Sequence, residues 1–496
     1  MSAEQITLED LPAEKGTDIV RVRPRVEAEL SDLLRSYSIL FQAADLHDGP
    51  VHLIIPKVMD RNIQHIQDAL NALGVTSQIY FAHKACKSPV FPKQARKNGI
   101  GIDVASRNEL ISALSAGFKG KDIICTGPKN REFVRLGLMH NCLISCDSED
   151  ELEKITELLE QHPEVPCSRI LIRISDVSSS DRKSLAAMSR FGMPQEKCAL
   201  LFSWLHQNPK ITLCGFHFHN DERGHDAKAG YIENIIRLME MAYEAGHAPT
   251  IIDIGGGLRS VRLETPNDWS DFIDQVAEGL LQRSDTGTWK RFGMGMSINP
   301  KGAIAGREKI QGKHAVDEDC AGMLRGVLGD DRFLGRAISE IIAEDGFSLA
   351  LEPGFSLLQQ AGLTLMKIVG LKEASDGTPL ILVDGNMYSI SQGMTEIMYD
   401  PFLIPRIEDP EDGDFEAHVI GNMCREEDII TKRRIRFPQM PSEGDLICFT
   451  NTAAYNMDFE DTNPHLHPKG QRFVAVKQND QWNIQSETTY NPYHSL

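Results

Sequence analysis

The stretch IYFAHKACKSPVFPKQARKNGIGIDVA, residues 79–105, holds two β-prone runs on either side of a helical run. The first run, IYFAHK, ends on Lys84, and the second, GIDVA, contains Asp103 near its end. Two strands joined by a helix form a parallel pair, so their carboxyl ends lie at the same edge of a sheet. Lys84 at that edge is either solvated or part of a site, and the rest of the chain distinguishes the two.

The alternation of strand and helix continues along the chain from about residue 50. The expected strands lie at 51–55, 79–84, 101–105, 122–127, 142–147, 169–175, 212–219, 250–257 and 348–354, and the main helices at 62–73, 107–117, 147–162 and about 227–246. Eight or so strands in this pattern predict parallel strands with crossover helices, and their polar residues lie at the carboxyl ends. We expect a β/α barrel, with a doubly wound open sheet as the alternative.

Two stretches depart from this rhythm. Residues of about 258–347 include a glycine-rich, charged segment and a helix near 331–344, and we interpret them as an insertion between the last two barrel strands. After Glu352, β-like segments separated by turn residues predict a mainly antiparallel β domain. The expected organisation is a barrel at 46–355, with the insertion, and a β domain made of 1–45 plus 356–496.

Composition narrows the class of protein. The 496 residues are 41% hydrophobic and 25% charged, as in a globular protein, and the formal net charge is −19. A chain this acidic is not expected to bind nucleic acid or an anionic membrane surface. The N-terminus lacks a signal peptide, no apolar run approaches membrane-spanning length, and ten cysteines occur without a CxxC pair. We therefore expect a cytoplasmic protein with reduced thiols.

Three short motifs carry candidate chemistry. In IDIGGG, residues 252–257, a glycine loop after a strand lets backbone N–H groups approach a phosphate, although a plain tight turn has the same sequence. LEPG, residues 351–354, places Glu352 at a strand end beside a rigid turn. In GFHFH we expect His217 and His219 to face opposite sides of their strand, so that they do not chelate one metal; we predict no metal site. A structural core histidine is the alternative for either.

These signals together fit one cofactor. Pyridoxal 5′-phosphate requires a lysine for a Schiff base, an acid near the ring nitrogen, a phosphate cradle and a flat partner for the ring. Lys84, Glu352, the glycines of 255–257 and His219 supply these in turn. A carboxylate at the ring nitrogen keeps it protonated, and the protonated ring then accepts electrons from the substrate α-carbon.

The order of motifs is more specific than any one of them. FAHK, DVAS, LIRIS, SRFG, GFHFH, DIGGG, EPG, MYD, CREED and AAY occur in that order between about residues 50 and 475. This order resembles the fold-type III pyridoxal-phosphate decarboxylases, among them ornithine, diaminopimelate and siderophore-precursor decarboxylases, related in fold to alanine racemase. The resemblance implies a TIM-type (β/α)8 barrel plus a mainly antiparallel β domain, a homodimer with the active site at its interface, and decarboxylation of an amino acid.

The resemblance also implies roles for barrel residues. Lys84 is similar to the Schiff-base lysine, His219 to the residue stacking on the pyridine ring, and Glu352 to the partner of the ring nitrogen. Further cofactor-binding positions follow from the same motifs: Asp103 near the floor of the site, Arg173 near the cofactor, and Gly255, Gly256, Gly257 and Gly354 around the phosphate.

The β domain contributes the remaining positions. Tyr399 and Asp400 in IMYDPF stand where the family holds its substrate. Cys424 resembles the cysteine that reaches the active site from the partner subunit and assists protonation of the decarboxylated carbon. Tyr455 in NTAAYN resembles a tyrosine that binds the cofactor phosphate. Asp428 has a milder claim to such a role, with a structural ion-pair partner as the alternative.

The sequence departs from the family pattern at three places. Phe355 follows EPG where the family commonly has an arginine on the phosphate, so backbone groups, Tyr455 or another cation must hold it. Asn220, Asp221 and Glu222 replace small residues after His219. Arg425 follows Cys424 where an acid usually binds a distal ammonium, and an arginine there suits a substrate tail that carries a carboxylate or another anionic or polar group. A solvated Arg425 in a local salt bridge is the alternative.

Several functions stay open at this point. The main prediction is a carboxy-lyase for an amino acid or amino-acid conjugate with an anionic or polar distal group. The alternatives are a diaminopimelate- or ornithine/lysine-type decarboxylase, an amino-acid racemase on the same fold, and a catalytically inactive decarboxylase-like regulator. A small pyridoxal-phosphate carrier is disfavoured by the length of the chain.

Overall fold

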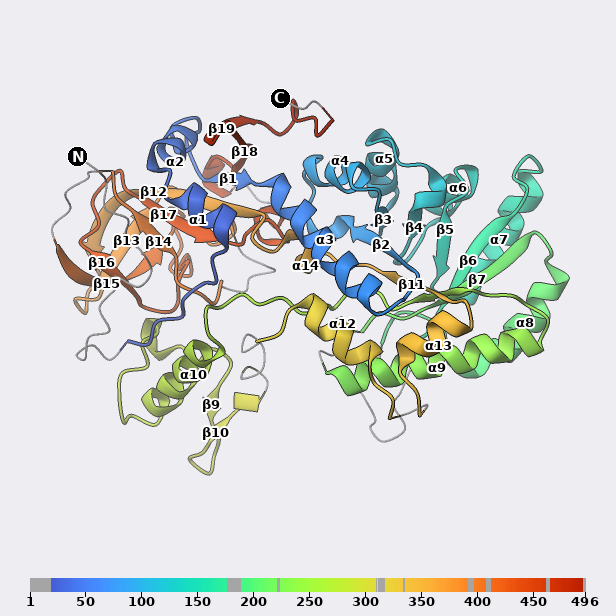
Figure 1. The fold of residues 1–496 in the computed structure, drawn as a ribbon. Helices are drawn as coiled ribbons and strands as arrows, with labels where there is room; N and C mark the ends of the chain where they lie inside the picture. Colours follow the sequence, from blue (N-terminus) through green and yellow to red (C-terminus); the bar gives the residue numbers. More distant parts are fainter. Residues whose placement is uncertain are drawn as a thin grey trace. The chain divides into compact units, whose positions relative to one another are not determined.

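The computed structural model describes residues 19–175, 189–220, 224–308, 310, 317–332, 335–390, 397–406, 412–460 and 464–493. The chain divides into two compact units. The barrel unit comprises residues 55–260, 318–359 and 485–496, and the sheet unit comprises residues 1–54, 261–317 and 360–484. Each unit is thus assembled from three separate segments of the chain, which Figure 1 colours in sequence order.

The barrel unit contains a closed parallel barrel, which confirms the predicted fold and excludes an open sheet. The strands follow the order β11-β2-β3-β4-β5-β6-β7-β8. Their bounds are β2 Ser77–Ala82, β3 Gly101–Val104, β4 Ile123–Cys125, β5 Leu143–Cys146, β6 Ser168–Arg173, β7 Ile211–His217, β8 Ile251–Asp253 and β11 Ser348–Leu351. β11 pairs in parallel with both β2 and β8 and so closes the ring.

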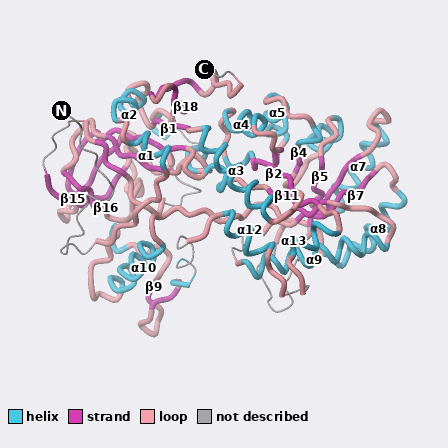
Figure 2. Tube along the Cα trace, viewed as in Figure 1, coloured by secondary structure: helices cyan, strands magenta, loops and turns pink. Residues whose placement is uncertain are grey.

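Helices cover the outside of these strands, as the cyan segments of Figure 2 show. They are α3 Pro56–Ala72, α4 Val90–Lys97, α5 Arg107–Ser115, α6 Arg131–Met139, α7 Glu149–Gln161, α8 Cys198–Gln207, α9 His225–Glu244, α12 Cys320–Leu328, α13 Ile338–Glu344 and α14 Phe355–Leu358. Ser106, Asn130 and Ser148 cap α5, α6 and α7, because each side chain accepts a hydrogen bond from a backbone N–H in the first turn.

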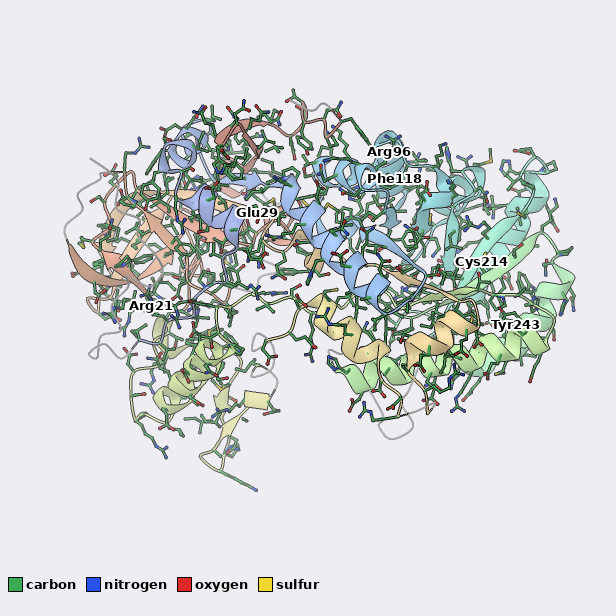
Figure 3. The ribbon with its side chains drawn as sticks, viewed as in Figure 1. Arg21, Glu29, Arg96, Phe118, Cys214 and Tyr243 are labelled. Atoms are coloured by element: carbon green, nitrogen blue, oxygen red, sulfur yellow. The ribbon has the colours of Figure 1, made fainter. Side chains whose placement is uncertain are left out.

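Local sequence also explains where one of these helices ends. α5 stops before Gly117, whose φ of +90° lies in the left-handed region that favours glycine. A Cβ at Gly117 would lie 2.9 Å from Cζ of Arg96, so the missing side chain makes room for that guanidinium; Arg96 is labelled in Figure 3. The sequence prediction of a glycine stop at this helix is confirmed.

An apolar layer fills the middle of the barrel, and we call it the barrel floor. Its members are Tyr80, Ile124, Leu143, Leu171 and Ala350, with Cys214 and Ile251 packed against them. Gly101 belongs to the same layer, since a Cβ there would lie 2.4 Å from the Tyr80 ring. Burial raises the pKa of the Tyr80 hydroxyl to about 12, as expected for a side chain without access to water.

The sheet unit is built around one nine-stranded sheet with the main order β16-β15-β13-β12-β1-β18-β19. Its strands are β1 Val51–Ile54, β12 Gly362–Glu373, β13 Pro379–Val383, β14 Phe402–Ile404, β15 Asp412–Ile420, β16 Ile435–Gln439, β17 Leu446–Thr450, β18 Gln471–Gln478 and β19 Gln481–Ser486. Most pairings are antiparallel, as predicted; β13–β15 and β1–β18 are parallel. The unit also holds helices α1 Ala28–Leu34, α2 Tyr37–Ala44 and α10 Pro266–Leu280, and a short hairpin of β9 Ser297–Ile298 and β10 Ile304–Ala305.

One expected barrel strand belongs elsewhere. The run at 51–55 was expected as the first member of the barrel alternation, but β1 pairs antiparallel with β12 and parallel with β18 in the sheet unit. The ring is already closed between β2 and β11, so no barrel edge is left for β1. Within the described residues, no helix is long and apolar enough to cross a membrane.

Candidate active site

The candidate site lies directly beyond the barrel floor, at the carboxyl ends of the strands. Side chains that point to one face of a strand recur every second residue, so the residue two positions after a floor residue faces the same interior. Five of these positions are polar, since Thr126, Ser145, Arg173, Asp253 and Glu352 follow Ile124, Leu143, Leu171, Ile251 and Ala350; Tyr80 and Cys214 are followed by the apolar Ala82 and Phe216. The floor therefore separates an apolar barrel bottom from a polar ring at the mouth.

Lys84 and Asp103 meet in this ring. Lys84 lies in a short 3-10 helix, His83–Ala85, that follows β2, and its Nζ is 3.5 Å from Oδ2 of Asp103. Asp103 is 1% exposed, and the Thr126 hydroxyl donates a hydrogen bond to its Oδ1. Burial, with a further contribution from Glu352, raises the pKa of Asp103 to about 6 even though Lys84 and Thr126 favour its ionised form.

His217, His219 and Glu352 form what we call the histidine–carboxylate cluster. Oε2 of Glu352 lies 3.8 Å from Nε2 of His217 and 3.7 Å from Nδ1 of His219. The expectation that the two histidines face opposite sides of the strand is wrong, because residues two apart share a face. Their ligand atoms and a Glu352 oxygen all lie within 4.8 Å of one another, a spacing that can hold a metal ion.

The protonation states within this cluster follow from its burial and its charges. Burial alone disfavours a charge on Glu352, but His217, His219 and Lys84 lie close enough to hold its pKa below the ordinary value, so this carboxylate is ionised. Burial lowers the pKa of His217 well below its usual range. Nδ1 of His217 is hydrogen-bonded to the Ser145 hydroxyl at 2.7 Å, which fixes the ring and directs Nε2 toward Glu352.

The glycine loop closes tightly around the same cluster. Oδ1 of Asp253 accepts a hydrogen bond from Gly255 N–H at 2.9 Å, and Gly256 N–H donates to Nδ1 of His219 at 3.2 Å. Gly255 has a φ of +62°, and a Cβ on Gly256 would lie 2.8 Å from the Glu352 carbonyl oxygen. Burial and the nearby Glu352 charge raise the pKa of Asp253 well above its usual range. Only glycines allow backbone so close to His219 and Glu352.

Arg173 and Gly354 complete the predicted barrel residues. Nη1 of Arg173 lies 3.4 Å from Oδ1 of Asp147, and its guanidinium lies over the Phe191 ring at 4.6 Å, so it is held from two sides. Gly354 is the N-cap of α14, the four-residue helix that begins at Phe355. Asp221 and Glu222 lie outside the described residues.

The sheet unit places Cys424 and Arg425 on its surface. Both are exposed; the guanidinium of Arg425 donates to the Tyr388 hydroxyl at 3.3 Å and lies 3.5 Å from Glu427. Asp428 shapes this loop, because its carboxylate accepts backbone hydrogen bonds from Met387 and Met423, both at 2.8 Å. The structural interpretation of Asp428 therefore fits, with backbone groups in place of an ion-pair partner.

The three other predicted residues of the sheet unit have structural contacts. Tyr399 is buried in the core and its hydroxyl donates to the Thr450 carbonyl at 3.0 Å. Asp400 accepts hydrogen bonds from the buried Arg433 at 2.7 Å and from Val22 N–H at 3.1 Å. Tyr455 has a φ of +64°, an uncommon backbone conformation for a residue with a side chain. Roles in substrate or cofactor binding stay predictions for all three.

Sequence reasoning missed several residues of the site. Thr126, Ser145 and Asp253 each support a predicted residue, and the two-residue spacing from the floor could have identified them. Lys228 gave no such signal. It lies on α9, where an isolated lysine is usually solvated, but it is buried and its Nζ lies 3.0 Å from the Gly256 carbonyl oxygen.

Comparisons with known proteins show what the chain is similar to. Residues 59–288 match the family described as "Pyridoxal-dependent decarboxylase, pyridoxal binding domain". The uncharacterized protein y4yA of Sinorhizobium fredii is 28% identical over 92% of this chain and 94% of its own length. Diaminopimelate decarboxylase of Archaeoglobus fulgidus is 25% identical over 46% of this chain and 56% of its own length, so the chain aligns with about half of that relative.

Solved structures extend the likeness to both units. Diaminopimelate decarboxylase from Helicobacter pylori, complexed with L-lysine, superposes with a TM-score of 0.63 at 18% identity and covers 90% of this chain and 95% of its own. Lysine/ornithine decarboxylase from Vibrio vulnificus gives a TM-score of 0.60 at 18% identity, with 91% and 99% covered. Residues 59–288 are thus similar to the pyridoxal-binding domain of pyridoxal-dependent decarboxylases, and the chain shares its fold with the solved decarboxylase structures.

Proposed function

We propose that this chain removes the α-carboxylate of an amino acid or amino-acid conjugate whose distal group is anionic or polar. The observation that carries the reaction class is the set at the barrel mouth, in which the exposed Lys84 lies beside the buried Asp103 and the histidine–carboxylate cluster. The observation that bears on the substrate tail is Arg425, exposed beside the exposed Cys424.

The barrel residues fit pyridoxal phosphate. Oε1 of Glu352 is buried and has no hydrogen-bond partner in the described structure, so it can accept a bond from the protonated ring nitrogen. A Cβ at Gly255 would lie 2.8 Å from Nδ1 of His219 and one at Gly256 2.8 Å from the Glu352 carbonyl oxygen, so the loop backbone can lie against the cluster because it carries no side chains there. When bound, the cofactor supplies a conjugated ring that accepts the electron pair left on the α-carbon when carbon dioxide departs.

The side chains around the ring have separate tasks. Lys84 supplies the amine that attaches the cofactor and releases the product, and the carboxylate of Asp103 holds Nζ at the mouth. Glu352 stays ionised and keeps the proton on the ring nitrogen. The apolar barrel floor closes the site from below and excludes water.

The proton for the decarboxylated carbon is assigned to Cys424. A thiol is a suitable general acid near neutral pH, and Cys424 is the exposed thiol among the described cysteines. We propose that it acts in the site of a second copy, so that a homodimer is the active form. The predicted binding of the cofactor phosphate by Tyr455 is part of the same proposal.

Arg425 selects the substrate tail in this proposal. A guanidinium binds a carboxylate through paired, charge-assisted hydrogen bonds and repels a terminal ammonium. Its contact with Glu427 is an exposed pair, 49% and 70% exposed, and such pairs contribute little, so Arg425 can exchange this partner for a substrate.

The test is carbon dioxide release by the purified protein with added pyridoxal phosphate. The substrates are diaminopimelate, ornithine, lysine, glutamate and a citryl-diaminopropionate conjugate, and Lys84→Ala is the inactive control. Activity on the acid-tailed substrates is expected. Arg425→Glu should lower kcat/KM on them by about 10- to 100-fold, the effect of losing one charged hydrogen bond. Arg283→Glu is the matched control, because Arg283 forms a comparable exposed pair with Glu278 at 3.2 Å.

The outcomes separate the alternatives. Release from ornithine or lysine alone, or full activity of Arg425→Glu, contradicts the assignment of the tail but keeps the reaction class. Racemised substrate without carbon dioxide indicates the racemase. No turnover and no cofactor absorbance that depends on Lys84 indicates a decarboxylase-like regulator, an alternative kept in view by the 29% identity over 183 residues to antizyme inhibitor 2 of Xenopus laevis.

A further inference from the structure

Lys228 lies directly behind the glycine loop. It is the fourth residue of α9, His225–Glu244, and is 1% exposed. Its Nζ donates to the carbonyl oxygens of Gly256 at 3.0 Å and Ile254 at 3.4 Å. The ammonium therefore contacts the loop from the side of the helix and not from the barrel mouth.

Burial of this ammonium requires compensating interactions, because lysine is almost never fully buried and transfer of its charge out of water is costly. The two carbonyl oxygens recover part of that cost. By bonding to the Ile254 and Gly256 carbonyls, Lys228 fixes the orientation of the Ile254–Gly255 and Gly256–Gly257 peptide groups. Because the N–H of a trans peptide group points opposite to its carbonyl, the N–H groups of Gly255 and Gly257 point away from Lys228, and the Gly255 N–H donates to Asp253.

Another cationic side chain near the glycine loop, that of Arg259, pairs with a carboxylate. Arg259, two residues after the last loop glycine, donates to Glu318 at 2.8 Å, and His225 lies 2.7 Å from the same carboxylate oxygen. At the strand end after Glu352, Gly354 is followed by an apolar residue, Phe355. Among the described lysines and arginines, Lys228 is therefore the one that bonds to the carbonyl oxygens of Ile254 and Gly256.

We propose that Lys228 is a positioning residue for the phosphate group of the cofactor. It holds the glycine loop in the conformation that directs the Gly257 N–H away from the helix, and its positive charge, in an interior of low dielectric, favours the dianion on the other side of the loop. The N-terminus of α9 adds a favourable partial charge of the same sign. This inference rests on the cofactor site proposed above.

The experiment compares two ligands that differ only in the phosphate. Cofactor-free protein is titrated with pyridoxal phosphate and with pyridoxal, and the absorbance that depends on Lys84 gives both dissociation constants. Lys228→Met keeps the length of the side chain and removes the charge. We expect it to weaken pyridoxal phosphate by about 10- to 100-fold and pyridoxal by less than about twofold.

Lys129→Met is the matched control. Lys129 is also buried in the barrel unit, and its Nζ donates to the carbonyl oxygens of Gly127 and Ser145 at 2.6 and 2.7 Å, near another strand end. Its substitution should leave the ratio of the two constants unchanged. Retained pyridoxal binding shows that Lys228→Met is folded, and 31P NMR of the bound phosphate should show a higher phosphate pKa in this variant.

Two results would overturn the proposal. One is an equal loss of affinity for both ligands in Lys228→Met, which indicates a purely structural role. The other is unchanged affinity for pyridoxal phosphate. If wild-type protein shows no absorbance with either ligand, the cofactor site itself is refuted, and that failure is visible before any variant of Lys228 is made.

Discussion

Replacing Asp103 by asparagine should stabilise the cofactor-free protein. The side chain is 1% exposed, and its pKa rises from 3.8 to about 6. That difference of about 2 corresponds to about 3 kcal/mol of cost for the ionised form in the folded state. Asparagine has the shape of the protonated acid and can still accept the bond from Thr126, so the variant avoids most of this cost.

The sign of the pH dependence follows from the direction of the shift. Because the folded pKa lies above the unfolded value, the folded state binds the proton more tightly, and the free energy of unfolding falls as pH rises from about 4 to about 6. The free energy of unfolding of Asp103→Asn does not fall in this way as pH rises. Its advantage should be small near pH 4 and reach about 3 kcal/mol above pH 6.

Thermal unfolding at pH 4.5, 5.5, 6.5 and 7.5 measures this. If the barrel unit unfolds cooperatively, the midpoint of the variant should exceed that of wild type by about 5–10 °C at pH 7.5, with a smaller gap at pH 4.5. Asp345→Asn, at an exposed aspartate, is the control and should show no such gap. A gap that is independent of pH, or a less stable variant at pH 7.5, would refute the reasoning.

Two further predictions concern other parts of the chain. Asp400→Asn leaves Arg433, 1% exposed and 2.7 Å away, without its charge partner and should cost about 3–5 kcal/mol in chemical unfolding. An unchanged unfolding midpoint with a raised KM would instead favour the predicted substrate role. Zinc should bind the cofactor-free histidine–carboxylate cluster with one-to-one stoichiometry in calorimetry. Prior addition of pyridoxal phosphate should prevent zinc binding. His217→Gln should weaken zinc binding, and His465→Gln should leave it unchanged. Equal zinc affinity with and without the cofactor would contradict this prediction.

The sequence predicts the barrel and its central residues because both depend on local patterns. Alternation of strand and helix specifies a parallel barrel, and polar residues at strand ends, such as Lys84 and Glu352, mark its mouth. The period of two along a strand would also have paired His217 with His219, and the error there came from assigning them opposite faces.

The parts that sequence reasoning missed depend on distant partners. Nothing local shows that β1 bonds to β12 and β18, more than 300 residues away in sequence. The hydrogen bonds of Asp400 to Arg433 and Val22 have the same origin. Lys228 stands on a helix like any solvated lysine, and only the fold brings its ammonium under the glycine loop.

The closing of the barrel by β11 has a consequence for synthesis of the chain. Leu349 pairs with Ser77, so the ring stays open until some 270 residues after its first strand have left the ribosome. Until then β2 and β8 present unpaired edges, which are templates for association with other chains. Nascent chains that stall before residue 348 are therefore expected to need chaperone protection, and stalled chains a few dozen residues longer should gain protease resistance in the barrel segment.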